Sequence, residues 1–225
     1  MYAVNNIKKS YNNIEWVSYH IPKTAGTSFR RSLCDAFGKK SVYGVYARTN
    51  AIEFNKGEMA WIPRGTKLLH GHFYPHRNHE NLFKNAKKII WLRDPVKRAW
   101  SLLNHTLDIK NNKIVLDYIN KKFLNPNALS REEMFLSILA DEKSKLFFTK
   151  YHASLSNFSK SYFDFIGNTE EYERDLNRLS GLMNKELKNF QVNLSSNHAP
   201  PPAIPTKLLS YFDQEYRVFN ALTSG

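Results

Sequence analysis

The sequence predicts an α/β fold: a single domain with a central, mostly parallel sheet flanked by helices. Apolar, β-rich runs alternate along the chain with segments in which apolar residues recur at helical spacing, which is the pattern of an α/β protein. With 225 residues and 42% hydrophobic residues, the chain is long enough for one proper core. We therefore expect one domain over residues 1–225, without internal repeats.

The first strand and helix are the clearest elements. A β-rich run that stops at Pro22 predicts a strand over 14–20. A helix over 26–37 follows, because apolar residues recur there at helical spacing: Phe29, Leu33, Ala36 and Phe37. Further apolar runs predict strands at 42–46, 66–72, 87–92 and 162–166, with a weaker one at 190–194.

The later helices are indicated by their caps and apolar stripes. Pro95 suits a first helical turn and Asp94 can cap it, which predicts a helix over 95–108. Ser130 and Glu133 form a capping box for 131–140. An apolar stripe predicts a helix over 169–180, and a last helix is expected at 206–222, after the stiff, proline-rich stretch 198–205. Residues 110–128 and 141–161 are interpreted as insertions.

The loop between the first strand and helix is suited to hold an anionic, tetrahedral group. It reads Lys23-Thr24-Ala25-Gly26-Thr27-Ser28. The N–H groups and dipole of a helix N-terminus attract negative charge, the glycine permits close approach, and the lysine and hydroxyls add donors. It is not a Walker A loop, in which the lysine follows the second glycine.

A second motif repeats this logic at the end of the strand over 87–92. Arg93 stands at the carboxyl end of that strand, where open α/β sheets place ligands. Ser101 lies about two helical turns further on and can face the same anion. Two such motifs indicate a ligand with two separated phosphate-like groups.

At these residues the chain resembles the PAPS-dependent sulfotransferases, in particular the carbohydrate branch with the uronyl and heparan sulfate 2-O-sulfotransferases. The stretch 20–28 looks like their 5′-phosphosulfate loop, and 93–101 is similar to their 3′-phosphate motif R-D-P-x-x-R-x-x-S. Leu69-His-Gly-His-Phe73 resembles the segment with the catalytic histidine, and 163–170 the strand and turn that close the site. The four motifs come in family order.

The resemblance implies a P-loop-like sulfotransferase fold and transfer of a sulfuryl group from PAPS to an acceptor hydroxyl, which leaves adenosine 3′,5′-bisphosphate (PAP). Lys23 would stabilise the leaving group, His72 would be the base and His70 would support it. The cofactor contacts would come from the loop Lys23, Thr24, Ala25, Gly26, Thr27 and Ser28, from Arg93 and Ser101, and from Asn197, His198 and Lys207. An in-line displacement with a histidine base suits such residues.

Charge is concentrated in the part of the chain that carries the motifs. Residues 1–150 hold 26 of the 33 Lys and Arg and 12 of the 20 Asp and Glu, a balance of +14, which concentrates anionic ligands. We expect a hydroxyl acceptor such as a glycan or another anionic small molecule. No helix-turn-helix, RNA-binding signature or zinc pattern supports nucleic acid as a partner.

Two alternatives stay open: a P-loop-related small-molecule kinase, and a non-catalytic module that binds nucleotides or acidic glycans. A zinc site at His70, His72, His76 and His79 lacks a completing cysteine or acidic cluster, so no metal is expected. One cysteine, no signal-peptide stretch and no run of 18 apolar residues favour a soluble, cytoplasmic protein.

Overall fold

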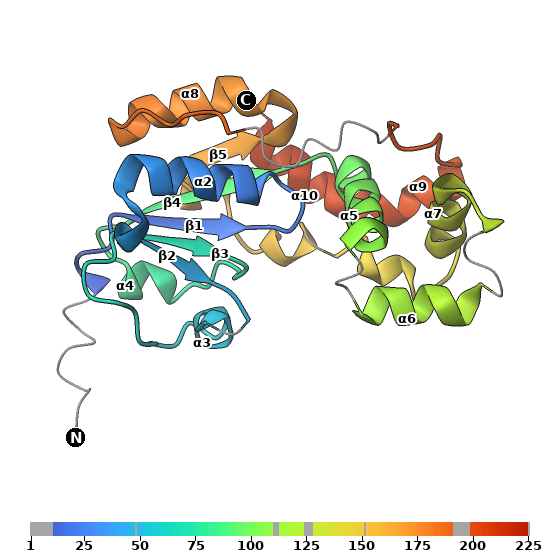
Figure 1. The fold of residues 1–225 in the computed structure, drawn as a ribbon, viewed down its shortest axis with the longest axis horizontal. Coiled ribbons are helices and arrows are strands. Elements are labelled where there is room, and N and C mark those ends of the chain that lie inside the picture. The colour runs from blue at the N-terminus through green and yellow to red at the C-terminus, as the bar shows by residue number, and fades with distance from the viewer. Residues whose placement is uncertain are drawn as a thin grey trace. The chain divides into compact units, whose positions relative to one another are not determined.

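The chain folds into two compact units. The computed structural model describes residues 11–47, 49–109, 113–123, 128–150, 152–190 and 199–224. One unit consists of the described residues up to Leu92 and within 157–194. The other consists of those within 93–156 and from 199 onward. Figure 1 shows the elements of both units along the chain.

The first unit is built on a parallel sheet. Its strands are β1 (Trp16–His20), β2 (Val42–Val45), β3 (Leu68–Gly71), β4 (Lys87–Leu92) and β5 (Phe165–Asn168). They lie in the order β2-β3-β1-β4-β5, and all four pairings are parallel. The predicted α/β class with a central parallel sheet is therefore confirmed.

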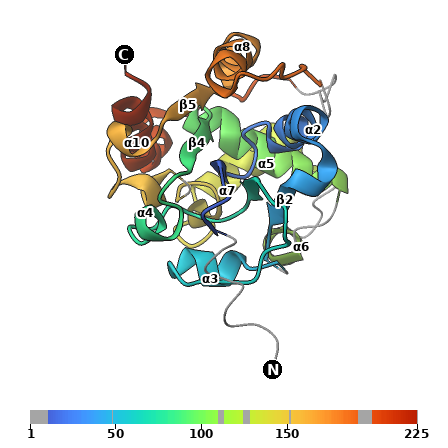
Figure 2. The ribbon, with the colours of Figure 1, turned by 90° about the vertical axis from the view of Figure 1, so that its left-hand side faces the viewer.

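Helices cover both faces of this sheet (Figures 1 and 2). On one face α2 (Gly26–Phe37) and α8 (Tyr172–Met183) pack against strand side chains such as Trp16, Ile89 and Trp91. On the other face lie the short helices α3 (Ala51–Asn55) and α4 (His79–Leu82). Since successive strand side chains alternate between faces, Ser18 and His20 lie on the α2 side and Tyr19 on the opposite side.

The strand order places a topological switch point between β1 and β4. The chain leaves β1 toward β2 and β3, whereas it leaves β4 toward β5 on the other side. In open α/β sheets the crevice outside the carboxyl ends of such a strand pair is the usual ligand site. The loop at 21–25 follows β1 directly, and Arg93 follows β4 directly.

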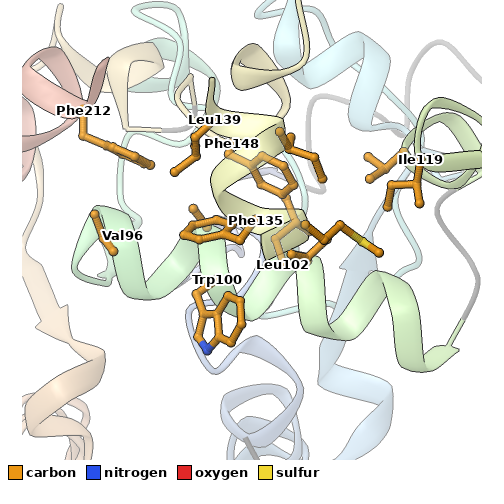
Figure 3. Close-up of a cluster of buried hydrophobic side chains, with 13 residues drawn as sticks. Val96, Trp100, Leu102, Ile119, Phe135, Leu139, Phe148 and Phe212 are labelled. Carbon is orange, nitrogen blue, oxygen red and sulfur yellow. The ribbon is translucent and has the colours of Figure 1, made fainter. Parts of the chain in front are cut away.

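The second unit is helical. It contains α5 (Pro95–Ile109), α6 (Lys113–Lys122), α7 (Arg131–Leu139), α9 (Thr206–Leu209) and α10 (Asp213–Thr223). Trp100 of α5, Ile119 of α6 and Phe135 of α7 meet in one hydrophobic cluster, to which Phe148 and Phe212 also belong (Figure 3). Burial of large apolar side chains of this kind is the main source of stability for such a unit.

Several predicted elements are confirmed closely. The helix over 26–37 has the expected bounds, the helix predicted over 95–108 extends to Ile109, and Ser130 and Glu133 form the predicted capping box of α7. The strands predicted at 42–46, 66–72 and 87–92 are present within two residues at each end. Of the weaker strand at 190–194, residues 191–194 lie outside the described residues.

Other predictions were wrong in detail. β5 begins at Phe165, three residues later than the start of the strand predicted over 162–166. A 3-10 turn (Thr169–Glu171) replaces the first residues of the helix predicted over 169–180. The last helix is divided by a 3-10 turn at Ser210–Phe212, where Phe212 is fully buried. The stretch 110–128, interpreted as an insertion, contains α6, which buries Val115 and Ile119 on one helical face.

Candidate active site

The loop after β1 has an unusual backbone. Lys23 and Ala25 adopt left-handed conformations, with φ of 74° and 59°. Residues other than glycine rarely do so, and such strained positions cluster at functional sites. Left-handed residues of this kind in a turn direct successive N–H groups to one side and make an anion-binding concavity.

Helix α2 begins at this loop with its N-terminus open. Ala25 is the N-cap, and among the described residues no side chain caps the helix and no acidic residue stands in its first turn. The first amides and the helix dipole can therefore act on a bound anion. This backbone is compatible with the anion cradle that the sequence predicts, which stays a prediction.

The predicted loop side chains differ in what they can offer. Thr24 is fully buried, and its hydroxyl donates to the Ile21 carbonyl at 2.8 Å. This hydrogen bond stabilises the loop, so the Thr24 hydroxyl proton is already used within the protein. Ser28 is buried and Thr27 is exposed at the start of α2. Burial is the main cause of the lowered pKa of His20, and Lys23 lies close enough for its charge to make the smallest of the contributions.

Gly26 leaves room for the side chain of His20. A Cβ at position 26 would lie 1.9 Å from two atoms of the His20 ring, far inside van der Waals contact. Burial, followed by the neighbouring His70 and His72, holds the pKa of His20 well below its usual range. His20 therefore packs as a neutral ring against the anion loop.

The His-Gly-His segment lies at the carboxyl end of β3, beside this loop. His70 is opposite Ser18 in register, and the two side chains are hydrogen bonded, with Ser18 Oγ 2.9 Å from His70 Nδ1. A Cβ on Gly71 would lie 1.7 Å from the Val45 carbonyl oxygen of β2. The strand then ends in a three-residue turn centred on His72, closed by the Phe73 N–H bonding to the Gly71 carbonyl at 3.0 Å.

Three imidazoles meet at this edge of the sheet. The His20 ring centroid lies 5.1 Å from that of His70, in a stacked arrangement, and 4.5 Å from that of His72. Burial, with smaller contributions from Arg30 and His72, lowers the pKa of His70 to about 3. Desolvation by partial burial also lowers the pKa of His72, although its side chain retains exposure to solvent. His72 is thus a neutral imidazole near pH 7 that an acceptor can reach.

Two further side chains adjoin the histidines and were not predicted. The Tyr46 ring stands edge-on to His72, with centroids 5.0 Å apart, and the Arg30 guanidinium lies over the Tyr46 ring at 5.9 Å. Arg30 is four residues after Gly26, which puts it on the same face of α2 one turn later. That spacing could have indicated from the sequence that Arg30 lies near the loop. For Tyr46 the sequence offered only its place at the end of a predicted strand.

The second predicted motif begins the second unit. Asp94 caps α5 as expected, since its Oδ1 accepts the Lys97 N–H at 2.9 Å. Arg93 and Ser101 are both half-buried. Arg98, in contrast, is fully buried and donates to the Phe148 carbonyl, so this motif arginine anchors α5 within its unit.

The other predicted cofactor contacts are at the C-terminal end of the chain. Lys207 lies in α9 and is exposed. Asn197 and His198 lie outside the described residues. The described part of the proline-rich stretch, residues 199–205, is non-helical as predicted.

A comparison with protein families decides the reaction class. The sequence profile described as the sulfotransferase family matches residues 12–220. The chain belongs to the sulfotransferase family. Sulfuryl transfer in general is therefore its reaction class, and neither the kinase nor the non-catalytic binding module gains support.

The fold of this sulfotransferase is similar to a crystal structure of a sulfotransferase from Alicyclobacillus acidocaldarius. The TM-score is 0.52 at 16% sequence identity, and the match covers 93% of this chain and 95% of the other. At this identity the likeness shows the fold alone. No curated protein matches the sequence.

The remaining histidines of this sulfotransferase have structural partners. His79 is fully buried; its Nδ1 lies 3.0 Å from the Tyr19 hydroxyl and its Nε2 lies 2.8 Å from the Phe54 carbonyl. His76 Nδ1 accepts the Asn78 N–H. Among the described residues, no group of three or more His, Cys, Asp or Glu side chains is placed to hold a metal ion.

Within the part of the chain that the structure describes, no helix is both long and apolar enough to span a membrane.

Proposed function

We propose that the chain is a PAPS-dependent sulfotransferase that transfers a sulfuryl group to a saccharide hydroxyl, with His72 as the general base, and that residues 1–225 act as one sulfotransferase domain. One observation carries the proposal: an exposed, neutral imidazole lies against His20, whose ring packs on Gly26 of the strained anion loop. A base beside an anion cradle is the arrangement that sulfuryl transfer requires.

The loop at 23–28 would hold the 5′-phosphosulfate. Its donors are the N-terminal amides of α2 and the Lys23 ammonium group. Arg93 and Ser101 would hold the 3′-phosphate, with Asn197, His198 and Lys207 as further contacts to the nucleotide. PAPS supplies the activated sulfuryl group, and these residues bind and orient it.

The reaction would be an in-line displacement at sulfur. His72 takes the proton of the acceptor hydroxyl as the oxygen–sulfur bond forms. The bond between sulfur and the leaving phosphate oxygen breaks, and Lys23 with the N-terminus of α2 stabilises the charge on that oxygen. The protonated His72 is exposed and returns its proton to solvent.

A saccharide acceptor is supported by two features. The His-Gly-His segment resembles that of the uronyl 2-O-sulfotransferases, and Tyr46 stands beside His72 with the Arg30 guanidinium over the Tyr46 ring. An aromatic ring can pack on a sugar face, and a guanidinium can pair with an acidic group. The single cysteine is compatible with a cytoplasmic location, which is part of the proposal.

Transfer of label from radioactive PAPS tests this function. The acceptors are an acidic polysaccharide, a neutral polysaccharide, a glycolipid and a phenol, each with the wild type and with His72→Ala. We expect label on a polysaccharide with the wild type alone. Label only on the phenol or the lipid part would contradict the saccharide acceptor, and magnesium-dependent phosphate transfer from ATP would instead indicate a kinase.

A further inference from the structure

The turn between β4 and α5 is hydrogen bonded to the C-terminal helix, α10. Asp94 uses both carboxylate oxygens there. Oδ1 accepts the Lys97 N–H at 2.9 Å, and Oδ2 accepts the Tyr216 hydroxyl of α10 at 3.0 Å. Hydrogen bonds to a charged acceptor are stronger than those between neutral groups. Asp94 is therefore fixed both by its own helix and by α10.

The neighbouring residue of α10 strengthens this junction. Glu215 is fully buried; its Oε2 accepts the His152 N–H at 2.8 Å and lies 3.2 Å from His152 Nδ1. Arg98, one turn after Asp94 on α5, is also fully buried; burial, and to a smaller extent the Arg98 charge, lowers the pKa of His152. Loss of the His152 N–H bond would leave the buried Glu215 carboxylate uncompensated, so this bond helps to fix α10.

Tyr216 differs from these buried residues. It is half-buried, and its ring packs against the hydrophobic cluster of the second unit, while its hydroxyl reaches Asp94. Asp94 is joined by a peptide bond to Arg93, which the proposed function assigns to the 3′-phosphate. The hydroxyl of Tyr216 thus bonds to the residue that directly follows, in the sequence, the arginine that would bind this phosphate.

We propose that Tyr216 is a positioning residue for the 3′-phosphate: through Asp94 it orients the Arg93 turn, so that α10 belongs to the nucleotide-binding machinery. This inference rests on the proposed function. Tyr216 itself touches no reacting atom. Its effect is on the affinity for nucleotides that carry a 3′-phosphate, and not on the chemical step.

Binding of two nucleotides to Tyr216→Phe tests the inference. PAP carries the 3′-phosphate and 5′-AMP does not. Calorimetric titration should show about tenfold weaker binding of PAP, the size of effect that loss of a hydrogen bond to a charged group produces. Binding of AMP should be unchanged, as should kcat at saturating PAPS. Phenylalanine keeps the ring in the hydrophobic cluster, so the variant should fold.

Two matched variants sharpen the test. Tyr211→Phe removes another tyrosine hydroxyl of the same unit, 3.5 Å from Glu142, and should change neither affinity. In the background of Arg93→Ala, Tyr216→Phe should have no further effect on PAP, since a positioning residue acts only through the residue it positions.

The outcomes separate this inference from the function on which it rests. A wild type that binds PAP and AMP equally well would remove the 3′-phosphate site and the inference with it. A wild type that prefers PAP, with a Tyr216→Phe variant of undiminished preference, would overturn the inference alone. The positioning role would also be excluded if the variant only lowers Tm, weakens PAP and AMP equally, or still weakens PAP when Arg93 is absent.

Discussion

The two anion motifs follow neighbouring strands of one sheet, yet they are built from different groups. After β1, two left-handed residues and an uncapped helix N-terminus present backbone N–H groups. After β4, the carboxylate of Asp94 occupies the corresponding position at α5 and accepts the Lys97 N–H. A negative side chain there opposes a bound anion, so under the proposed function the second motif would bind its phosphate through the side chains of Arg93 and Ser101.

From this difference we expect the two motifs to have different roles, one in turnover and one in nucleotide binding. Backbone amides at a strained loop are preorganised and can stabilise charge that develops during a reaction. A single arginine on a turn suits a fixed charge that does not change between ground state and transition state. We therefore expect substitutions in the first unit to lower turnover and substitutions at the second motif to lower nucleotide affinity.

The largest effect is expected for His72→Ala. Loss of a general base typically lowers turnover by about two to four orders of magnitude. PAP affinity should be retained, since His72 is assigned to the acceptor and not to the nucleotide. Initial rates with saturating PAPS and calorimetric titration with PAP measure the two quantities. His76→Ala is the matched control, and its turnover should equal that of the wild type.

The pH dependence of the wild type belongs to the same prediction. A base must be neutral to accept a proton, so kcat/KM should rise with pH and then level off. Because the pKa of His72 is lowered, the inflection should lie below the usual histidine value of about 6.5. Near-normal turnover of His72→Ala with an unchanged pH profile would move the base to another group.

Lys23→Ala should have the next largest effect. Lys23 is assigned to charge that develops on the leaving phosphate, and removal of one such donor typically lowers kcat by about 10²- to 10³-fold. KM for PAPS should change less than kcat. Lys39→Ala, an exposed lysine just after α2, is the control for a general loss of positive charge. A variant with normal kcat and a raised KM alone would refute the assigned role.

Arg93→Ala should act on binding. We expect PAP affinity to fall by about 10- to 100-fold, as for a charged hydrogen-bonding group, with kcat at saturating PAPS nearly unchanged. Lys97→Ala removes an exposed charge from the first turn of the same helix and should alter neither. A large loss of kcat in Arg93→Ala would contradict the proposal that the second motif serves nucleotide affinity and not turnover.

Local sequence patterns predicted most of the sheet and both motifs. These elements have strong local signals: the apolar run of β4, the Pro95 start of α5 and the loop before α2. The missed helix α6 has Val115 and Ile119 at helical spacing, but its lysines and asparagines indicated a surface insertion. The division of the last helix follows the burial of Phe212, a tertiary effect that local propensity does not contain.

Residues of the candidate site could be proposed from the sequence only where they are contiguous. Lys23, His70 and His72 stand in recognisable motifs, whereas Ser18 meets His70 through strand register and Tyr46 meets His72 through a ring contact just after β2. Register could not be derived from the sequence, because several pairings of these apolar strands bury the same residues. The strained backbone at Lys23 and Ala25 was likewise unexpected, since neither residue type favours a left-handed conformation.

The smallest effect is expected for Ser18→Ala, which tests how His70 supports its neighbour. The serine is fully buried, and its hydroxyl lies 2.9 Å from His70 Nδ1. A hydrogen bond between neutral groups contributes about 1 kcal/mol. Its loss should lower Tm slightly and, through the contact of His20 with both imidazoles, lower kcat/KM about three- to tenfold. Thr66→Val removes the hydroxyl of a buried residue two positions before β3 and should lower Tm alone.

The pH profile of Ser18→Ala carries the sharper information. His70, with a pKa of about 3, stays neutral throughout the range in which the enzyme would be assayed. The inflection in kcat/KM should therefore keep its position even as the plateau falls. A displaced inflection would mean that His70 itself titrates in the assay. The base would then be shared between the two histidines, and the exposed position of His72 would no longer decide which of them receives the proton.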